Sequence, residues 1–200
     1  MEFGASDGVS NSNSYYFEKH LDWKGICVEP VIPDYNALLK TRSCKAYQGA
    51  VLPTCENSTV RIAVTPFRGT SGVRGHELDG GHVRAADLGA KWGDKVREYN
   101  VPCYTLQGLL EEAGYDHVDY LAIDTEGGEL EIVEAFPWGE FEVDVVQIEA
   151  VSKTPKNTRD RVSIIEAMRE NGYVRDAELS VVKEQFTTDL IFVRAGWRMD

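Results

Sequence analysis

The sequence predicts an α/β fold: a three-layer sandwich in which helices cover both faces of a mostly parallel seven-stranded sheet with one antiparallel strand. Segments with strand and helix patterns alternate along most of the 200 residues, which favours parallel strands joined by crossover helices. Several strand segments are short, continuous apolar runs, as expected for strands buried on both faces. The chain ends on two strand segments with a short connection, which indicates a hairpin and hence one antiparallel strand.

The first elements alternate between strand and helix. Residues 1–4 form the end of a strand, and a loop rich in Gly, Ser and Asn leads to a helix over about 14–21. The apolar run 25–29 ends in an acid followed by a proline, which suits a buried parallel strand. Residues 33–41 have a helical pattern and a proline in the first turn, where proline is tolerated. Residues 46–51 form the third strand.

The middle of the chain contains one long irregular segment. Residues 59–65 alternate like a strand, whereas residues 67–95 hold seven glycines and have no periodic pattern. Loops of that length are usually functional or disordered, so we expect a Gly-rich insertion or lid there. Beyond it, residues 101–105 are extended and residues 106–113 are helical.

The last part of the chain returns to regular alternation. A buried strand at 118–123 precedes a helix at 128–135 and a strand at 143–148. Residues 160–170 place their apolar side chains at helical spacing. The closing strands are 173–182 and 188–194. We expect one domain over residues 1–200, excised from a longer chain, because the first strand begins almost at residue 1.

Acidic residues gather at the predicted carboxyl ends of the strands, where ligands of such sheets bind. They are Glu2 and Asp7 at the end of the first strand, Glu29 at the end of the second, Asp124 and Glu126 at the end of the strand at 118–123, and Glu149 at the end of the next. A phosphate-binding loop would avoid these charges and would contain G-x-G-x-x-G, which is missing here. The first loop therefore suits a cation or a neutral polar ligand.

Glu29 follows the glycine loop by about 20 residues, at the end of the second strand. A carboxylate at that place is suited to hydrogen-bond the two hydroxyls of a ribose. Together with the acidic loop, it indicates adenosine without phosphates.

These motifs resemble the FkbM-type S-adenosylmethionine-dependent O-methyltransferases. The resemblance runs in order over residues 2–149, and its strongest part is D-x-E-G-x-E at the end of the 118–123 strand. Its motifs are Glu2-x-Gly4-Ala5-x-Asp7-Gly8 with Asn11-Ser12-Asn13, Val28-Glu29-Pro30, Gly49-Ala50-Val51, Thr105-Leu106, Asp119 to Gly127 with Glu129, and Val145 to Glu149. It implies a Rossmann-like, class I methyltransferase fold, S-adenosylmethionine as cofactor, and methyl transfer to a hydroxyl of a sugar or glycosylated acceptor, such as a deoxyhexose.

The resemblance also implies the residues that bind the cofactor. They are Glu2, Gly4, Ala5, Asp7, Gly8, Asn13, Glu29, Pro30, Ala50, Val51 and Asp124. Within this set, the residues of the first loop would line the methionine part, Glu29 would hold the ribose, and Ala50 and Val51 would flank the adenine.

Methyl transfer also needs a group that takes the hydroxyl proton, and a carboxylate can do so. The candidates are Asp124 and Glu126 as base, with Glu149 orienting the acceptor. In the alternative interpretation, Asp124 caps the helix that follows, and Glu126 and Glu129 favour its positive end. Three converging carboxylates also suit a divalent metal such as Mg²⁺, although we favour a site without metal.

Four residues are candidates for contact with the acceptor: His76, His82, Trp92 and Lys153. The two histidines and the tryptophan lie in the Gly-rich segment, which could fold over an acceptor. Surface histidines, a tryptophan that anchors the loop to the core, and a solvated lysine are the alternatives.

Charge and composition limit the partners. The net charge of −12 disfavours nucleic acid, apart from a local basic patch over residues 68–97. No apolar run approaches the roughly 18–20 residues of a membrane helix, and no leader opens the chain. Four cysteines without a C-x-x-C pair indicate reduced, buried thiols. We therefore expect a cytoplasmic protein with a small-molecule or glycan acceptor, no membrane partner, and a glycosyltransferase domain linked to it in the longer chain.

Two other function classes use the same kind of fold. A nucleotide-dependent oxidoreductase or epimerase is disfavoured because G-x-G-x-x-G and a Tyr-x-x-x-Lys pair are missing from the sequence. A non-catalytic S-adenosylmethionine-binding module remains the second alternative.

Overall fold

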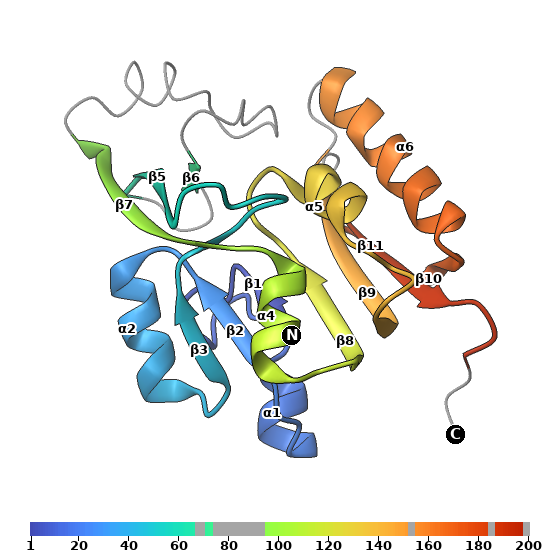
Figure 1. Ribbon diagram of the computed structural model, residues 1–200, viewed down its shortest axis with the longest axis horizontal. Helices are drawn as coiled ribbons and strands as arrows, with labels where there is room; N and C mark the ends of the chain where they lie inside the picture. Colours follow the sequence, from blue (N-terminus) through green and yellow to red (C-terminus); the bar gives the residue numbers. More distant parts are fainter. Residues whose placement is uncertain (67–70, 74–94, 152–154, 184–186, 198–200) are drawn as a thin grey trace.

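The computed structural model describes residues 1–66, 71–73, 95–151, 155–183 and 187–197. Figure 1 shows a large twisted sheet with helices packed on it and a smaller sheet beside it. The large sheet has the strand order β10-β11-β9-β8-β1-β2-β3. Its strands are β1 (Glu2–Phe3), β2 (Ile26–Glu29), β3 (Lys45–Gln48), β8 (His117–Ile123), β9 (Glu142–Val151), β10 (Tyr173–Lys183) and β11 (Thr187–Arg194).

The large sheet is mixed. The five strands from β3 to β9 pair in parallel. β11 pairs antiparallel with both β9 and β10, and the β10–β11 hairpin forms one edge of the sheet. The predicted α/β fold with a large sheet and a closing hairpin is therefore confirmed, with antiparallel pairing on both sides of β11.

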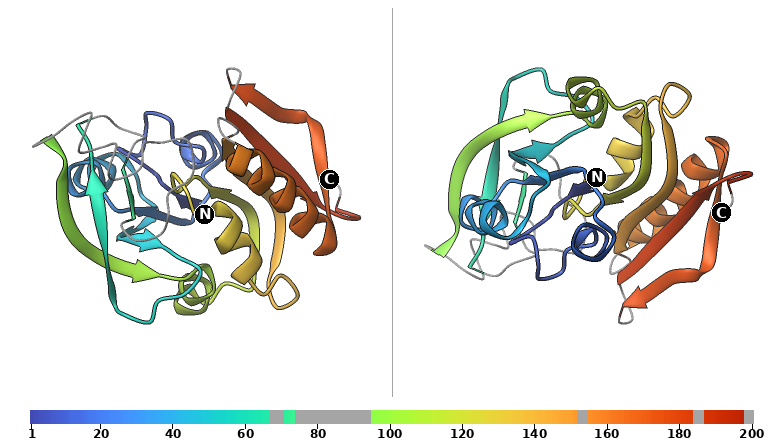
Figure 2. Two further views of the ribbon diagram at one scale, coloured as in Figure 1. Left: turned by 90° about the horizontal axis from the view of Figure 1, so that it is seen from above. Right: turned by 90° about the horizontal axis from the view of Figure 1, so that it is seen from below.

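Helices cover both faces of the large sheet, as Figure 2 shows from above and below. Leucine, isoleucine and methionine side chains of α4, α5 and α6 join the main core on one face. On the other face, Leu38 of α2 packs on Cys27 and Ala5, and Phe17 of α1 contacts the ring of Tyr120. The described helices are α1 (Tyr15–Leu21), α2 (Ile32–Thr41), α4 (Leu106–Ala113), α5 (Glu129–Ala135) and α6 (Pro155–Glu170).

A second sheet, which the sequence analysis did not predict, has the order β4-β7-β5-β6. It is built from β4 (Ala50–Val51), β5 (Thr59–Val64), β6 (Gly72–Val73) and β7 (Arg97–Tyr104). β5 pairs antiparallel with β6 and β7. The second sheet has its own small core around Ile62, Val73 and Val101. Apart from residues 71–73 and 95, the predicted insertion or lid at 67–95 lies outside the described residues.

The predicted third strand, 46–51, is in fact two strands in two sheets. β3 ends at Gln48 in the large sheet, and β4 begins at Ala50 and pairs with β7 of the second sheet. Gly49 sits at this transition. A Cβ atom there would come within 2.6 Å of the Pro102 carbonyl oxygen and 2.5 Å of the Tyr104 ring, so only glycine allows the chain to pass.

The cysteines are paired, and the prediction of reduced thiols is wrong. Cys27 on β2 is bonded to Cys44 just before β3, and Cys55 in the β4–β5 connection is bonded to Cys103 on β7. Pairing depends on the fold that brings distant cysteines together, which spacing along the chain does not reveal. Because disulfides are rare in the cytosol, the pairing counts against the cytoplasmic expectation. None of the described helices has the length and apolar character of a membrane span.

Candidate active site

A cavity of about 480 Å³ opens where the carboxyl ends of several parallel strands meet the second sheet. The ends of β1, β2, β8 and β9 contribute Gly4, Glu29, Asp124 and Glu149. No lysine, arginine or histidine occurs among the lining residues that the structure describes, whereas five acids do: Glu29, Asp34, Asp124, Glu126 and Glu149. The lining thus favours a neutral or positively charged ligand, as the sequence analysis expects.

The opposite wall of the cavity is apolar and comes mainly from the second sheet. This wall includes Ala50 and Val51 of β4, Ile62 and Val64 of β5, and Val73 of β6. The family resemblance implies that Ala50 and Val51 flank the adenine, whereas Ile62, Val64 and Val73 were not predicted to contact a ligand. Their alternating pattern predicts a strand but does not say which ligand the strand would cover.

Gly4 allows the chain to turn away from β1 directly beside β8. Its φ angle is +79°, and a Cβ atom would lie 1.9 Å from the Asp124 carbonyl oxygen. A side chain would therefore push the ends of β1 and β8 apart. Glycine here keeps Asp124 at the cavity next to the first loop.

Glu29 lies at the end of β2, is 5% exposed and lines the cavity. Its two carboxylate oxygens accept hydrogen bonds from the backbone N–H groups of Ser6 and Val31, each at 2.8 Å. A carboxylate offers about four acceptor positions, so the two oxygens can each take a further hydroxyl. Burial raises the pKa of Glu29 to about 7, despite these hydrogen bonds.

Asp124, Glu126 and Glu149 converge as the sequence analysis predicts. One carboxylate oxygen from each lies within 4.8 Å of the others. Burial first, and then the charges of Glu149 and Glu126, raise the pKa of Asp124 well above its usual value. A carboxyl with a raised pKa is a better base near neutral pH than an ordinary aspartate.

The turn between β8 and α5 sets the position of Glu126. Glu126, Gly127 and Gly128 have positive φ angles of 61°, 117° and 105°. Glu129 holds this turn, because its Oε1 accepts hydrogen bonds from the Thr125 N–H and hydroxyl and from the Gly127 N–H, all at 2.9 Å. Glu129 thus has the structural role that the alternative interpretation gave it at the start of α5.

The helix-capping alternative does not describe Asp124. Gly128 occupies the N-cap position of α5, and no side chain caps it by a hydrogen bond. Asp124 faces the cavity instead.

Six of the eleven predicted cofactor residues line the cavity, and the other five do not. Those that line it are Gly4, Glu29, Pro30, Ala50, Val51 and Asp124. Glu2, Ala5, Asp7, Gly8 and Asn13 are not among the residues that line it, so their assignment to the cofactor stays a prediction.

These five residues form hydrogen bonds and packing contacts in and around the first loop. Glu2 is fully buried and accepts hydrogen bonds from the Asn13 N–H and from two serine hydroxyls. Asp7 accepts from backbone N–H groups two and three residues ahead. Gly8 packs on α2, Ala5 lies in the core beside α2, and the Asn13 side chain accepts from Gln147. Ser6 and Asn11 are the loop residues that reach the cavity besides Gly4.

The four predicted acceptor contacts, His76, His82, Trp92 and Lys153, lie outside the described residues. Asp34 of α2 and Thr65 after β5 line the cavity and were missed. Neither belongs to a recognisable motif.

The profile of the methyltransferase FkbM domain matches residues 2–175, most of the chain. The chain belongs to the FkbM methyltransferase domain family. A crystal structure of a methyltransferase from Pyrococcus furiosus is similar at 11% identity and a TM-score of 0.44, covering 98% of this chain and 75% of that one. No curated protein matches the sequence.

FkbM methyltransferases use S-adenosylmethionine, and the described residues fit this cofactor. Glu29 offers open acceptor positions for a ribose, the β4 and β5 residues form an apolar wall for a flat base, and the acids of the β8 and β9 ends suit a sulfonium charge. The same three acids are the described candidates for a metal site at the cavity, but carboxylates alone do not establish one.

Proposed function

We propose that this FkbM-domain protein is an S-adenosylmethionine-dependent O-methyltransferase that acts on a carbohydrate hydroxyl, such as one of a deoxyhexose. One observation carries the proposal: a single cavity joins Glu29, placed for a ribose, to the acidic cluster Asp124, Glu126 and Glu149. An adenosine phosphate would be repelled by this lining, whereas an adenosyl sulfonium would be attracted.

The residues that would hold the cofactor follow from the cavity. Glu29 would accept the two ribose hydroxyls, and the base would lie between Pro30, Ala50 and the β5 side chains. When bound, S-adenosylmethionine supplies an electrophilic methyl group. The close approach of Gly4 to Asp124 holds the first loop beside the acidic cluster, which favours alignment of the reacting groups.

The acidic cluster would remove the proton of the acceptor hydroxyl. Asp124 shares a hydrogen bond with Glu149, and their mutual repulsion with Glu126 favours one bound proton among the three. We infer that Asp124 or Glu126 takes the hydroxyl proton while Glu149 orients the acceptor. No metal is required for this step.

The direct test is incubation of the protein with S-adenosylmethionine and a panel of glycosides, followed by mass spectrometry. The proposal predicts an acceptor that gains the mass of one methylene, together with S-adenosylhomocysteine as product. The panel includes each sugar with and without a free hydroxyl at each position, which identifies the acceptor atom.

Two outcomes would overturn the proposal. Binding of S-adenosylmethionine without transfer to any glycoside, amine or lipid hydroxyl would favour a binding module. Methyl transfer to an amine alone would support a methyltransferase but refute the carbohydrate acceptor.

Repeating the reaction with EDTA tests whether the site works without metal. The proposal predicts that the chelator does not change the rate.

A further inference from the structure

The loop between β1 and α1 contributes directly to the cavity. Ser6 and Asn11 line it, and the Ser6 N–H donates a hydrogen bond to Glu29. Residues 4–14, all within the described part of the chain, form neither helix nor strand. Ser6 and Asn11 have positive φ angles of 49° and 60°, which are unfavourable for residues with side chains. Other contacts must therefore hold the loop in this conformation.

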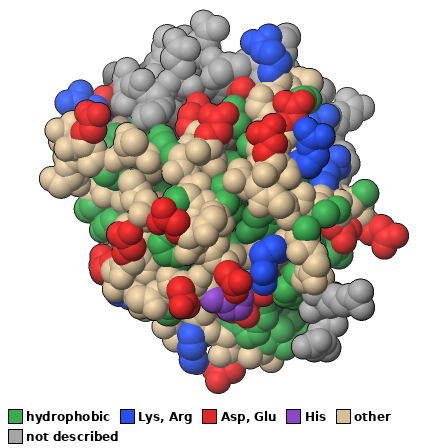
Figure 3. All heavy atoms as spheres, turned by 45° about the vertical axis from the view of Figure 1, so that its right-hand side comes forward, with side chains coloured by type: hydrophobic (Ala, Val, Ile, Leu, Met, Phe, Trp, Pro, Cys, Tyr) green, Lys and Arg blue, Asp and Glu red, His purple; other side chains and the backbone are tan. Residues whose placement is uncertain are grey.

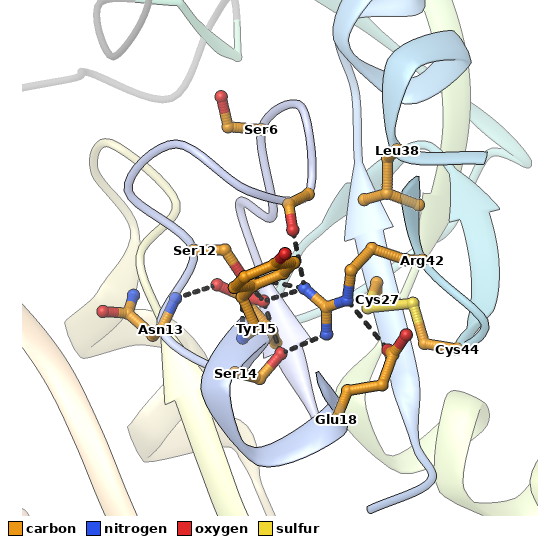
Figure 4. A network of polar contacts seen from close by, with 12 residues as sticks. Ser6, Ser12, Asn13, Ser14, Tyr15, Glu18, Cys27, Leu38, Arg42 and Cys44 are labelled. Atoms are coloured by element: carbon orange, nitrogen blue, oxygen red, sulfur yellow. Dashed lines mark hydrogen bonds and ion pairs between the residues drawn. A yellow bond between two sulfur atoms is a disulfide. The ribbon is translucent and has the colours of Figure 1, made fainter. Parts of the chain in front are cut away.

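Arg42, at the end of α2, supplies several of these contacts (Figure 4). Its side chain is 1% exposed. Nη1 donates to the Gly8 carbonyl at 3.1 Å and to the Ser12 hydroxyl at 2.8 Å, and Nη2 donates to the Ser14 hydroxyl at 2.8 Å. One guanidinium thus holds three points along the loop.

Two buried acids balance the charge of Arg42. Nε donates to Glu18 Oε2 at 2.8 Å, and Nη1 lies 3.6 Å from Glu2 Oε2. Burial alone would raise the pKa of Glu18, but hydrogen bonds from the Ser43 N–H and Arg42 outweigh it and lower that pKa. The Ser12 and Ser14 hydroxyls donate onward to Glu2. The serines therefore connect the arginine on α2 to the acid on β1.

A guanidinium is needed for this arrangement. Its planar fork presents five N–H groups in fixed directions, whereas a lysine ammonium is a single point with three donors. A lysine at position 42 would retain the charge but could not reach Glu18, Gly8 and both serines at once.

The Cys27–Cys44 disulfide fixes the same region from the other side. Cys44 is two residues after Arg42, and Cys27 is two residues before Glu29 on β2. The bond therefore ties the chain that carries Arg42 to the strand that carries Glu29, and Figure 4 shows it beside the arginine.

We propose that Arg42 is a positioning residue that holds the 4–14 loop in its cofactor-binding conformation, a role that rests on the proposed function. Arg42 does not line the cavity and acts through Ser6 and Asn11. It should therefore set the affinity for S-adenosylmethionine and leave the transfer step at saturation unchanged.

Arg42→Lys tests the proposal, with Arg194→Lys as a control for loss of an arginine–carboxylate pair away from the loop. Arg194 also donates from two nitrogens to a carboxylate: Nη2 lies 2.7 Å and Nε 3.1 Å from Asp144 Oδ1. Neither Arg194 nor Asp144 lines the cavity. We expect Arg42→Lys to raise the Kd and the KM for S-adenosylmethionine by about tenfold or more, as is typical for lost hydrogen bonds to charged groups, with kcat within about threefold. Amide hydrogen exchange should speed up in residues 5–14. Arg194→Lys should leave both the affinity and this exchange at their original values.

The outcomes separate this inference from the proposed function. If the original protein binds neither S-adenosylmethionine nor S-adenosylhomocysteine, the proposed function fails. If it binds them and Arg42→Lys binds equally well while remaining folded, the positioning role is refuted and the proposed function stands.

A second variant covers the case in which Arg42→Lys does not fold. Ser12→Ala combined with Ser14→Ala keeps the Arg42–Glu18 ion pair but removes two of the loop's attachments to the arginine. The same rise in Kd with unchanged kcat supports the proposal, and an unchanged Kd overturns it.

Discussion

Two groups of carboxylates, the buried pair Glu2 and Glu18 and the half-buried cluster Asp124, Glu126 and Glu149, differ in what surrounds them. Glu2 and Glu18 face a guanidinium, serine hydroxyls and backbone N–H groups. Asp124, Glu126 and Glu149 face one another, and burial and mutual repulsion raise the pKa of Asp124. The donors around a carboxylate, more than its place at a strand end, thus separate an acid that stabilises the fold from one available for chemistry. Acidic side chains are also spread over the outer face shown in Figure 3, where solvent supplies the compensation.

The largest expected effect is on catalysis by the acidic cluster of Asp124, Glu126 and Glu149. Glu126→Gln should lower kcat by about 10²–10⁴-fold, the usual contribution of a general base, and change the Kd for S-adenosylmethionine by less than about threefold. Removing one of the mutually repelling carboxylates should leave the melting temperature unchanged or raise it. Glu131→Gln, on the exposed side of α5, is the control. A kcat equal to that of the control would remove Glu126 from the mechanism.

Substitution of the buried acids Glu2 and Glu18 should instead lower stability. Glu2→Gln should lower the free energy of unfolding by about 3 kcal/mol, because it removes one partner of a buried ion pair. Glu112→Gln breaks an exposed pair with Lys45 and should cost at most about 1 kcal/mol. Urea unfolding measures both. An equal cost for the two variants would contradict the structural role of Glu2.

Glu29 combines properties of the two groups of carboxylates, because it accepts backbone hydrogen bonds and yet has a raised pKa. A ribose would bind the ionised carboxylate, so the Kd for S-adenosylmethionine should rise about tenfold for each unit that the pH falls below the pKa of about 7. Calorimetry from mildly acidic to mildly alkaline pH measures this, and Glu29→Gln should remove the dependence.

The same shift predicts the stability of the ligand-free protein. Because the folded pKa of Glu29 lies above its usual value of 4.5, its contribution is fully present below that pH and is lost as the pH rises through about 7. The loss is about 3 kcal/mol at 1.4 kcal/mol per pKa unit. A melting temperature that depends on pH equally in Glu29→Gln would assign the effect to other groups.

The smallest effect distinguishes the two candidate bases. Charge on Glu126 raises the pKa of Asp124, so Glu126→Gln should move the acidic limb of any residual pH–rate profile to lower pH if Asp124 is the base. An unmoved limb with the same residual rate would contradict coupling between them.

The sequence predicts the ends of β2 and β8 well, because an acid directly ends or follows each apolar run, whereas β9 continues to Val151, beyond Glu149. Neighbouring parallel strands then bring Asp124 and Glu149 together without further information. Glu29 follows for the same reason. The helices also follow from periodicity, with boundaries shifted by a few residues.

The second sheet and the roles inside the first loop could not be predicted in this way. β5 and β7 pair across more than thirty intervening residues, and no local pattern specifies that partner. The Cys55–Cys103 bond has a separation of 48 residues and depends on the same sheet. Glu2 is the first residue of β1 and lies two positions before the level of Glu29 and Asp124. Its side chain is buried beneath the first loop beside Arg42, which only tertiary contacts reveal.

Parallel calorimetric titrations of the 200-residue protein with S-adenosylmethionine, S-adenosylhomocysteine and NAD test the central claim most directly. An acid-lined cavity with Glu29 at the proposed ribose position predicts micromolar binding of the first two ligands, a loss of about 10–100-fold in Glu29→Gln, and no binding of the phosphate-bearing NAD. Binding of NAD with no response to either sulfur compound would contradict the account.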